Sequence, residues 1–422
     1  MSARRFTRSA MGVAAVLAAC VCAPAASAAA AAAHWVEAWY SPPFPTTAAW
    51  GCNQQRTFTH QSVRQVVRLE TGGSRVRVRL TNELGLSRVR FGEVTVAASS
   101  PNGVLLGPVH VLTFDGRRGG VIPIGKAWVS DPLEMRVHRF ENLAISVYYP
   151  SGATPAGHLK HLWVSPPGNH VTEAVWPLGG RPQAPGLASG VEVYAAHPRP
   201  VLVAFGDSIT EGFCSTPGMH LDYPEQLARL LAAHAADRRW VVINSGISGN
   251  RLLHNGAGPK ALSRFRRDAL DIPGVRAIVL LEGINDIGWA YDPSGDTGPL
   301  PASAIIGAYR DLIRQAHARG IKIYLGTLTP YLGAIYEHPA GEKVREQVNA
   351  WIRRGHGFDG VIHFDGALRD PRHPHHYLRA LQCGDDLHPN DAGYHLMAET
   401  VYKELFAPGR SLARAAAAHP HR

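Results

Sequence analysis

Short apolar segments recur through the second half of the chain, with helix-like segments between them. Each apolar segment is long enough for one buried strand, and consecutive segments begin about 35 to 45 residues apart. This alternation predicts strand–helix–strand units, which form a parallel sheet covered by helices on both faces. The predicted strands are 201–205, 240–244, 277–283, 322–328 and 361–365, and the predicted helices are 223–236, 303–320, 342–354 and about 391–406.

The first half has a different pattern. From residue 34 to about 195, short apolar runs are separated by Gly, Pro, Asn and Asp. The runs 74–80, 89–97 and 142–149 are typical of strands, and long amphipathic helices are absent from the pattern. We therefore predict an antiparallel β-sandwich. Residues 195–200, with two prolines and no periodicity, predict a linker.

The first 33 residues have the pattern of a secretory signal peptide. Three arginines precede an apolar run from Met11 to Ala19, and an alanine-rich stretch follows. The run is too short to span a bilayer as a resident helix. Cleavage near Ala28 predicts a secreted or periplasmic protein. Cleavage before Cys20, in a Leu-Ala-Ala-Cys box, would instead leave a lipoprotein tethered to the membrane through that cysteine.

Charge and metal-ligand patterns exclude two classes of function. Without the first 33 residues the formal charge is about +7, from 40 basic and 33 acidic residues, and the basic residues are scattered. Nucleic-acid-binding proteins concentrate basic residues on one stripe, so we expect no nucleic-acid partner. His373, His375 and His376 are crowded, but no acid or cysteine at metal-ligand spacing accompanies them, so we expect no metal and no cofactor.

Polar blocks follow the predicted strands. In a parallel sheet, ligands bind beyond the carboxyl ends of the strands. The blocks are therefore predicted to converge on one edge. They are Gly206-Asp207-Ser208 after the first strand, 244–250 after the second, 283–288 after the third and 383–391 past the fifth.

Ser208 lies where a strand gives way to a helix, and on its own it is explained equally well as a helix N-cap or as a nucleophile. A serine hydroxyl becomes a nucleophile only beside a base. His388 is the candidate base, and Asp385, three residues earlier, is its candidate partner, with Asp386 as the alternative. These residue types could form a Ser-His-Asp triad.

The four blocks resemble those of the SGNH or GDSL hydrolase superfamily of esterases and lipases, and they occur in the same chain order. The resemblance covers about residues 199–408. It implies a three-layer α/β/α domain with a flavodoxin-like parallel sheet. It also implies Ser208 as the nucleophile, with His388 and Asp385 completing the triad.

The same resemblance assigns the oxyanion-stabilising groups to the N–H of Ser208, the N–H of Gly249 and the side-chain amide of Asn285. Glycine suits this position because the absence of a Cβ lets its N–H approach a substrate. Gly246 is the alternative within the same loop, and we interpret it as a turn glycine. Donors of this kind act on the charge that forms in the transition state.

Three cysteines follow the first 33 residues, namely Cys52, Cys214 and Cys383. Export would permit a disulfide. Cys214 stands six residues after Ser208, and Cys383 stands two residues before Asp385. Because both flank the predicted site, we predict a Cys214–Cys383 disulfide that leaves Cys52 free.

The stretch HWVEAWYSPP and the block GINDIG are similar to a secreted bacterial subgroup related to xylan esterases. The similarity implies a serine esterase that removes acetyl or other short acyl groups from carbohydrate through an acyl-enzyme. Trp289 and Tyr291, just beyond Asn285, are the candidate substrate-stacking residues. The alternatives are a lipase or an acyltransferase of the same superfamily and, from another class, a non-catalytic carbohydrate-binding surface protein. The predicted segments are a signal peptide (1–33), a β-sandwich (34–195), a hydrolase domain (199–408) and a disordered tail (409–422).

Overall fold

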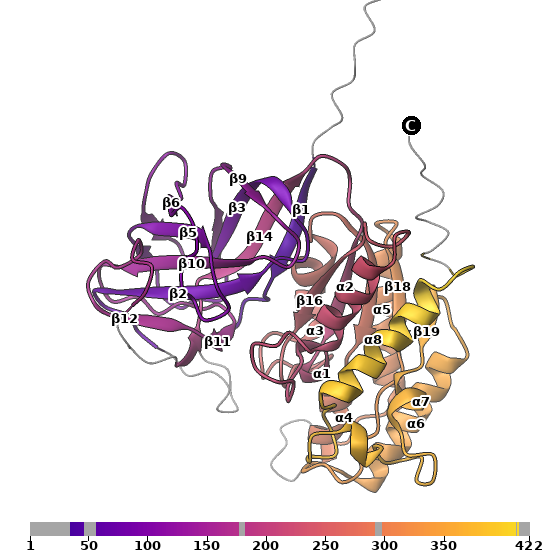
Figure 1. Ribbon diagram of the computed structural model, residues 1–422. Coiled ribbons are helices and arrows are strands. Elements are labelled where there is room, and N and C mark those ends of the chain that lie inside the picture. Colours follow the sequence, from indigo (N-terminus) through magenta and orange to yellow (C-terminus); the bar gives the residue numbers. More distant parts are fainter. Residues whose placement is uncertain (1–33, 46–55, 177–181, 292–297, 411, 413–422) are drawn as a thin grey trace, which may run out of the picture. The chain divides into compact units, whose positions relative to one another are not determined.

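The computed structural model describes residues 34–45, 56–176, 182–291, 298–410 and 412 (Figure 1). The predicted signal peptide with Cys20, the cysteine at position 52 and residues 413–422 lie outside the described residues.

Two five-stranded antiparallel sheets form the N-terminal half (Figure 1). The first has the order β1-β14-β3-β8, with β9 also paired to β3, and the second has the order β12-β2-β10-β5-β6. Their strands are β1 (His34–Tyr40), β2 (Gln61–Arg68), β3 (Gly73–Asn82), β5 (Val94–Ala98), β6 (His110–Val111), β8 (Lys126–Val129), β9 (Leu133–Val137), β10 (Asn142–Tyr149), β12 (Trp163–Pro167) and β14 (Ala188–Ala195). Two further pairs are β4 (Val89–Phe91) with β7 (Gly120–Ile122) and β11 (Leu159–His161) with β13 (Gln183–Pro185).

Alternation of residue type explains how these sheets pack. In β3, Val76, Val78 and Leu80 are fully buried, whereas the arginines between them are only partly buried. The buried side chains join those of β2, β10 and β14 in one apolar core, so the two sheets form a sandwich. We refer to the described residues up to 195 as the sandwich.

The prediction of one strand over 89–97 is wrong, because the chain changes sheets within it. β4 ends at Phe91 and pairs with β7, whereas β5 begins at Val94 and pairs with β10. At Gly92 a Cβ would lie 2.8 Å from the Tyr148 ring, so this position needs a glycine where the chain leaves β4. An apolar pattern alone does not mark such a change of partner.

A five-stranded parallel sheet lies at the centre of the second half, from residue 201 onward, which we call the α/β half. Its strand order is β16-β15-β17-β18-β19, and every residue of β15 is buried, as expected for a strand covered on both faces. Counted along this half, the order is 2-1-3-4-5, which is flavodoxin-like. The strands are β15 (Val201–Gly206), β16 (Val241–Gly246), β17 (Val275–Leu281), β18 (Lys322–Gly326) and β19 (Gly360–Ile362).

Helices cover this sheet. α2 packs against α8, and α5 packs against α3 and α6 (Figure 1). The four helices predicted from periodicity correspond to α2, α5, α6 and α8, whereas the remaining short helices are too short to show a period. The helices are α1 (Ser208–Glu211), α2 (Tyr223–Ala233), α3 (Ala261–Phe265), α4 (Ile284–Tyr291), α5 (Ala302–His317), α6 (Pro339–Arg353), α7 (Phe364–Leu368) and α8 (Asp391–Leu405), with a π-helix η1 (Arg266–Leu270) and a 3-10 helix η2 (Arg379–Leu381).

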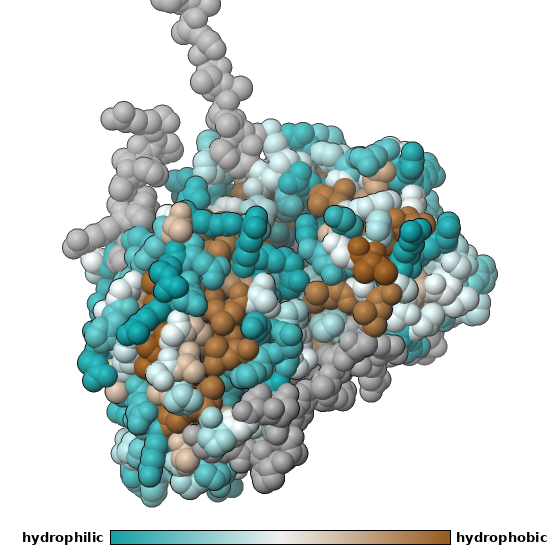
Figure 2. All heavy atoms as spheres, turned by 180° about the vertical axis from the view of Figure 1, so that it is seen from behind, coloured by the Kyte–Doolittle hydropathy of each residue, from teal (hydrophilic) through white to brown (hydrophobic). Residues whose placement is uncertain are grey.

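Buried polar contacts join the sandwich to the α/β half. The Tyr40 hydroxyl at the end of β1 donates to Asp268 of η1 at 2.7 Å. Arg68 at the end of β2 pairs with Glu225 of α2. On the face seen in Figure 2, hydrophobic residues form separate groups between hydrophilic ones. None of the described helices is long and apolar enough to cross a membrane.

Candidate active site

Ser208 is held at the carboxyl end of β15. A Cβ at Gly206, the last residue of the strand, would lie 2.1 Å from the Leu281 carbonyl oxygen, so only glycine fits there. Asp207 then caps α1, because its Oδ1 accepts the N–H of Ile209 at 3.0 Å. The interpretation of Ser208 as the cap is therefore wrong. Ser208 is the first residue of α1, and its hydroxyl is left for other contacts.

His388 contacts both Ser208 and Asp385. Its Nε2 lies 2.8 Å from Ser208 Oγ, and its Nδ1 lies 2.6 Å from Asp385 Oδ2. A carboxylate only accepts hydrogen bonds, so Nδ1 carries a hydrogen and Nε2 can accept the serine proton. The three side chains have the geometry of a Ser-His-Asp triad.

Asp385 rather than Asp386 orients the imidazole. Asp385 Oδ1 accepts the N–H groups of Leu387 at 3.0 Å and His388 at 2.9 Å. Burial raises the pKa of Asp385, but the hydrogen bonds and charge of His388 and the Leu387 N–H outweigh burial and lower it to about 2. Asp386 instead accepts Nε2 of Gln382 at 3.0 Å. The alternative partner is thus engaged elsewhere.

Gly249 lies in a tight turn that follows β16. The Asn250 N–H donates to the Ile247 carbonyl oxygen at 3.0 Å, which closes a four-residue turn. The φ of Gly249 is +74°, the left-handed value that a type II turn requires at its third residue. The Gly249 N–H belongs to the central peptide, which the turn itself does not use. Within the described residues, neither this N–H nor that of Ser208 donates a hydrogen bond.

Asn285 supplies a third donor, from α4. Its side chain is 3% exposed, its Nδ2 donates to the Asn250 carbonyl oxygen at 3.0 Å, and its Oδ1 accepts the Tyr336 hydroxyl at 3.1 Å. These contacts fix the orientation of the amide against the Gly249 turn. An amide nitrogen carries two hydrogens, so one remains for a substrate oxygen.

Gly246, the alternative oxyanion residue, is the last residue of β16 and not a turn glycine. Its N–H donates to Oδ1 of Asn244 at 2.9 Å. A Cβ at this position would lie 2.2 Å from the backbone nitrogen of Glu211, so β16 and α1 approach too closely for any other residue. The donor of Gly246 is already engaged, whereas that of Gly249 is not.

The arrangement follows from the strand order. Strand order reverses between β15 and β17, and open parallel sheets bind ligands at such a switch point. Ser208 follows β15, and Asn285 follows β17 by a few residues. The α/β half therefore brings the predicted residues together at one edge of the sheet.

Sequence interpretation missed Arg264, a fully buried residue of α3 beneath this edge. Its hydrogen bonds to neutral acceptors are 2.8 to 3.0 Å long, and its two closest carboxylates lie at 3.4 and 3.6 Å. Two of the four polar blocks are thus tied to one guanidinium, and Glu282, the residue before the third block, lies close to it. The partners are the carbonyl oxygens of Gly206 and Ser245, Oδ1 of Asn250, and the carboxylates of Asp268 and Glu282.

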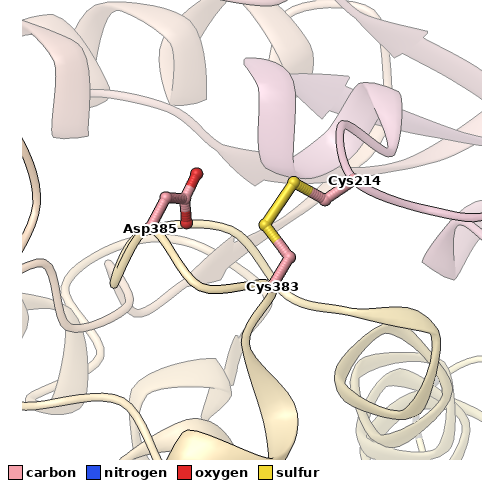
Figure 3. A group of neighbouring side chains, drawn as sticks. All are labelled: Cys214, Cys383 and Asp385. Carbon is pink, nitrogen blue, oxygen red and sulfur yellow. A yellow bond between two sulfur atoms is a disulfide. The ribbon is translucent and has the colours of Figure 1, made fainter.

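A disulfide joins Cys214 and Cys383 beside Asp385 (Figure 3), which is the predicted pairing. The Cα atoms are 6.2 Å apart, and 169 positions separate the two residues in sequence. The bond ties the segment after α1 to the segment that carries Asp385. The ligating atoms of these three residues lie within 4.8 Å of one another, but both sulfurs are in the disulfide, so the group is not a metal site.

The crowded histidines have an acidic neighbour that the sequence did not reveal. His375 Nδ1 lies 2.8 Å from Oε1 of Glu342 and 3.7 Å from Oε1 of Glu346. The three side chains are close enough together to bind one metal ion. Arg345, which is fully buried, already pairs with both glutamates. The Arg345 guanidinium therefore already neutralises the carboxylates that a metal cation would need.

Of the two candidate substrate residues, Trp289 packs edge-on against Tyr336, with ring centroids 5.1 Å apart. Tyr291 ends α4, and its side chain lies outside the described part of the chain. Their role toward a substrate stays a prediction. Phe213, which the sequence did not indicate, is half-exposed, and its ring centroid lies 4.6 Å from that of His388.

The α/β half matches a known protein family. Residues 204–396 match the GDSL-like lipase/acylhydrolase family. No curated protein matches the chain.

Among solved structures, an acetyl xylan esterase, AlAXEase, is 21% identical with a TM-score of 0.38, and the match covers 48% of this chain and 98% of that one. An acetylxylan esterase from Geobacillus stearothermophilus, Axe2, is 20% identical with a TM-score of 0.38, over 49% of this chain and 93% of that one. A GDSL-like lipase from Bacteroides thetaiotaomicron is 19% identical with a TM-score of 0.36, over 49% and 87%.

Proposed function

We propose that this protein removes acetyl or other short acyl groups from carbohydrate outside the cytoplasm, with Ser208 as the nucleophile. The basis is that the chain carries a GDSL-like lipase/acylhydrolase domain and is a carboxylic ester hydrolase. The observation that carries the proposal is the continuous contact from Ser208 Oγ through the His388 ring to Asp385, at 2.8 and 2.6 Å. Three donors beside it complete the requirements for acyl transfer.

The first half of the reaction forms the acyl-enzyme. Ser208 Oγ attacks the ester carbonyl carbon while His388 Nε2 takes the hydroxyl proton, and the carbonyl oxygen becomes an oxyanion. The N–H groups of Ser208 and Gly249 and the amide of Asn285 stabilise this oxyanion. Asp385 stabilises the imidazolium. The carbon–oxygen bond to the alcohol then breaks, and His388 returns the proton to the leaving alkoxide.

The second half releases the acid. Water gives a proton to His388 Nε2 and attacks the acyl carbon, and the same three donors stabilise the second oxyanion. The bond to Ser208 Oγ breaks, and the proton returns to the serine. The lowered pKa of Asp385 keeps its carboxylate ionised throughout the neutral range.

Support for a short acyl group on a sugar comes from the surroundings of Ser208. The half-exposed Phe213 ring lies against His388 and offers one aromatic face, which suits a small acyl group or the apolar face of a sugar ring. The signal-peptide pattern and the resemblance to xylan esterase-like proteins support a polysaccharide substrate outside the cell. Fold similarity by itself does not fix a substrate.

A panel of substrates tests this function. The processed protein is incubated with acetylated xylan, acetylated pectin and p-nitrophenyl acetate, butyrate and palmitate, beside Ser208→Ala. We expect acetate release from the polysaccharides, hydrolysis of the acetate at least about tenfold faster than of the palmitate, and loss of at least about 10³-fold in Ser208→Ala.

Each alternative has its own signature in the same assay. Faster hydrolysis of palmitate would indicate a lipase, and transfer of acetate to an added sugar alcohol would indicate an acyltransferase. Binding of xylan without turnover of any ester would indicate a non-catalytic binding protein. Full activity in Ser208→Ala would overturn the proposed nucleophile.

We also propose that the protein is exported, as the first 33 residues predict. Mass spectrometry of the mature N-terminus, after expression in a bacterium, tests this. A free N-terminus between residues 29 and 34 supports secretion, and an acylated Cys20 supports the lipoprotein alternative. An intact Met1 in all of the protein would contradict export.

A further inference from the structure

The sandwich contacts the turn that carries Gly249, and we propose that it positions this turn for catalysis through Glu211. The inference rests on the proposed esterase function, because it concerns one of the three oxyanion donors. We call residues 247–250 the oxyanion turn. In this inference, Glu211 and His158 are positioning residues, and the sandwich has a role in the reaction.

Glu211 bridges three parts of the molecule with one carboxylate. It is the last residue of α1, three positions after Ser208. Its Oε2 accepts the N–H of Ser248, the residue before Gly249, at 2.7 Å. Its Oε1 lies 2.7 Å from His158 Nε2 and 3.4 Å from Lys160 Nζ, both from the sandwich. The carboxylate therefore connects the nucleophile helix, the oxyanion turn and the sandwich.

The hydrogen bonds of His158 fix its charge in this arrangement. The residue is 5% exposed, and its Nδ1 lies 3.0 Å from the Pro42 carbonyl oxygen. A carbonyl oxygen and a carboxylate both only accept, so both ring nitrogens carry hydrogen and the ring is an imidazolium. The bridge to Glu211 is thus a charge-assisted hydrogen bond.

Glu211 itself remains a carboxylate. Burial raises its pKa, but the charges of His158 and Lys160 and the hydrogen bonds from His158 and Ser248 outweigh burial and hold the pKa far below its usual range. The Glu211 side chain is 19% exposed, so solvent screens these contacts only in part.

An apolar contact supports the same turn from the sandwich side. Phe44, which follows β1, forms a small buried cluster with Ile247 and Ala257. The Phe44 ring also lies edge-on to His158, with ring centroids 6.1 Å apart. An apolar contact from the sandwich at Ile247 and a polar contact that reaches Ser248 through Glu211 therefore meet at the first two residues of the oxyanion turn.

Among the described residues, the hydrogen-bond partners of the Asn250 side chain, at the far end of the turn, all belong to the α/β half. Asn250 Nδ2 donates to the carbonyl oxygens of Ala257 at 2.8 Å and Pro259 at 2.9 Å, and its Oδ1 accepts Nε of Arg264 at 2.8 Å. The central peptide of a four-residue turn has opposite orientations in type I and type II turns. Because both ends of the turn are anchored, the Gly249 N–H stays in one of these two orientations. The bridge through Glu211 to the sandwich acts at the Ser248 end.

Loss of the bridge should therefore weaken oxyanion stabilisation without loss of the triad. Removing one oxyanion donor outright lowers kcat by about 10² to 10³. We expect Glu211→Ala, which frees the turn but keeps the donor, to lower kcat about 10- to 100-fold and to change KM by less than about twofold. A general loss of folded protein would lower the active concentration and leave kcat per folded molecule unchanged.

A conservative variant should rescue the geometry. In Glu211→Gln, the amide oxygen can accept the Ser248 N–H, and the amide nitrogen can donate to a neutral His158 Nε2. We expect kcat within about threefold of the wild type. His158→Phe should lower kcat about as much as Glu211→Ala. The double variant should be little worse than either single variant, because both break one bridge.

Arg139→Gln is the matched control, because it removes a different contact between the sandwich and the α/β half. Arg139 donates to the carbonyl oxygens of Arg238 at 2.9 Å and Trp240 at 2.8 Å and is not part of the site. We expect a lower midpoint of urea unfolding and kcat within about twofold of the wild type.

The readout is the steady-state rate of p-nitrophenyl acetate hydrolysis by the full processed chain. Each rate is scaled to the folded fraction, which is measured by near-UV circular dichroism. Wild-type kcat in Glu211→Ala and His158→Phe would overturn the inference, and so would an equal loss in Arg139→Gln. If Glu211→Ala does not fold, Glu211→Asp, which shortens the bridge, replaces it in the comparison with Glu211→Gln. An inactive wild type would instead refute the proposed function.

Discussion

The sandwich and the α/β half each bury an arginine beneath their loops, but the two arginines have different partners. Arg64 of β2 is 1% exposed and donates to the carbonyl oxygens of Gly103, Glu173 and Ala174 and to Ser146 Oγ, all within the sandwich. Burial lowers its pKa to about 10. Its contacts fasten surface segments to a sheet and meet no reactive group.

Arg264 uses the same donors in another setting. Its neutral partners, in Gly206, Ser245 and Asn250, belong to two polar blocks of the candidate site, and Asp268 and Glu282 balance its charge. Burial lowers the pKa of Arg264, and the two carboxylates oppose the effect. A buried guanidinium is thus a general way to fix loops. In the α/β half the loops that it fixes lie at the carboxyl ends of parallel strands, where ligands bind in such sheets.

The largest loss of kcat is expected at Asp385, whereas the neighbouring Asp386 should matter little. Asp385→Asn should lower kcat about 10³- to 10⁴-fold, because the neutral amide no longer holds the proton on His388 Nδ1 or stabilises the imidazolium. Asp386→Asn, one residue away, should stay within about threefold, because this side chain contacts Gln382. Steady-state kinetics on p-nitrophenyl acetate measures both, and equal losses would show that position in the loop, and not contact with His388, matters.

The second prediction compares the two arginines directly. Lysine keeps the charge but cannot reach all the acceptors of a guanidinium, so Arg264→Lys and Arg64→Lys should each lower the free energy of unfolding by about 2 to 4 kcal/mol. Only Arg264→Lys should also lower kcat of the folded fraction, by about tenfold or more. Urea unfolding and kinetics measured on the same samples test this. A similar kcat loss in Arg64→Lys would remove the distinction between the two regions.

A smaller effect is expected at Tyr336, which holds the Asn285 amide. Tyr336→Phe removes the hydroxyl that donates to Asn285 Oδ1 at 3.1 Å. A net hydrogen bond contributes about 1 kcal/mol, so kcat should fall about three- to tenfold with little change in KM. Tyr331→Phe is the control, because the Tyr331 hydroxyl donates to the His338 carbonyl oxygen at 3.1 Å. Unchanged kcat in Tyr336→Phe would mean that packing alone orients the amide.

The smallest effect concerns a carboxyl group near the boundary between the two regions. Burial, and then the charge of Glu225, raise the pKa of Asp222 to about 7. Between about pH 4 and pH 7 the folded protein therefore binds more protons than the unfolded chain at this group, so the stability contribution falls as pH rises through that window.

Asp222→Asn should remove this dependence. Asp222 caps α2 through an oxygen that accepts the Glu225 N–H at 3.1 Å, and asparagine can keep that contact. We expect the variant to gain about 1 kcal/mol or more over the wild type at pH 8 and to differ little at pH 5. Urea unfolding at the two pH values measures the difference. An equal effect at both would show that the carboxyl is not protonated in the folded protein.

Local patterns made much of the site predictable. Strands of the parallel sheet are continuous apolar runs, and three of the four polar blocks come at the end of a strand, so order along the chain was enough to predict that the blocks converge. The roles of Gly249 and Asn285 came from the family resemblance. The spacing of three residues between Asp385 and His388 lets one short turn place both side chains. The predicted disulfide likewise joins cysteines that flank these blocks.

Contacts of distant residues outside the four polar blocks and the disulfide were not predictable. Arg264 stands in the run SRFRRD, which resembles a charged surface, and only the fold shows which arginine points inward. Glu211 and Tyr336 gain their roles from residues 37 or more positions away, His158 and Asn285 among them. The break between β4 and β5 is invisible for the same reason, because strand partners rather than strand propensity decide it.

Covalent labelling with a fluorophosphonate reports on Ser208 itself, because this reagent reacts with a serine that a neighbouring base has activated. We expect one label per chain, located by peptide mass spectrometry on Ser208, with no label in Ser208→Ala and labelling at least about 100-fold slower in His388→Ala. A folded wild-type protein that stays unlabelled, or a label that persists in Ser208→Ala, would contradict this prediction.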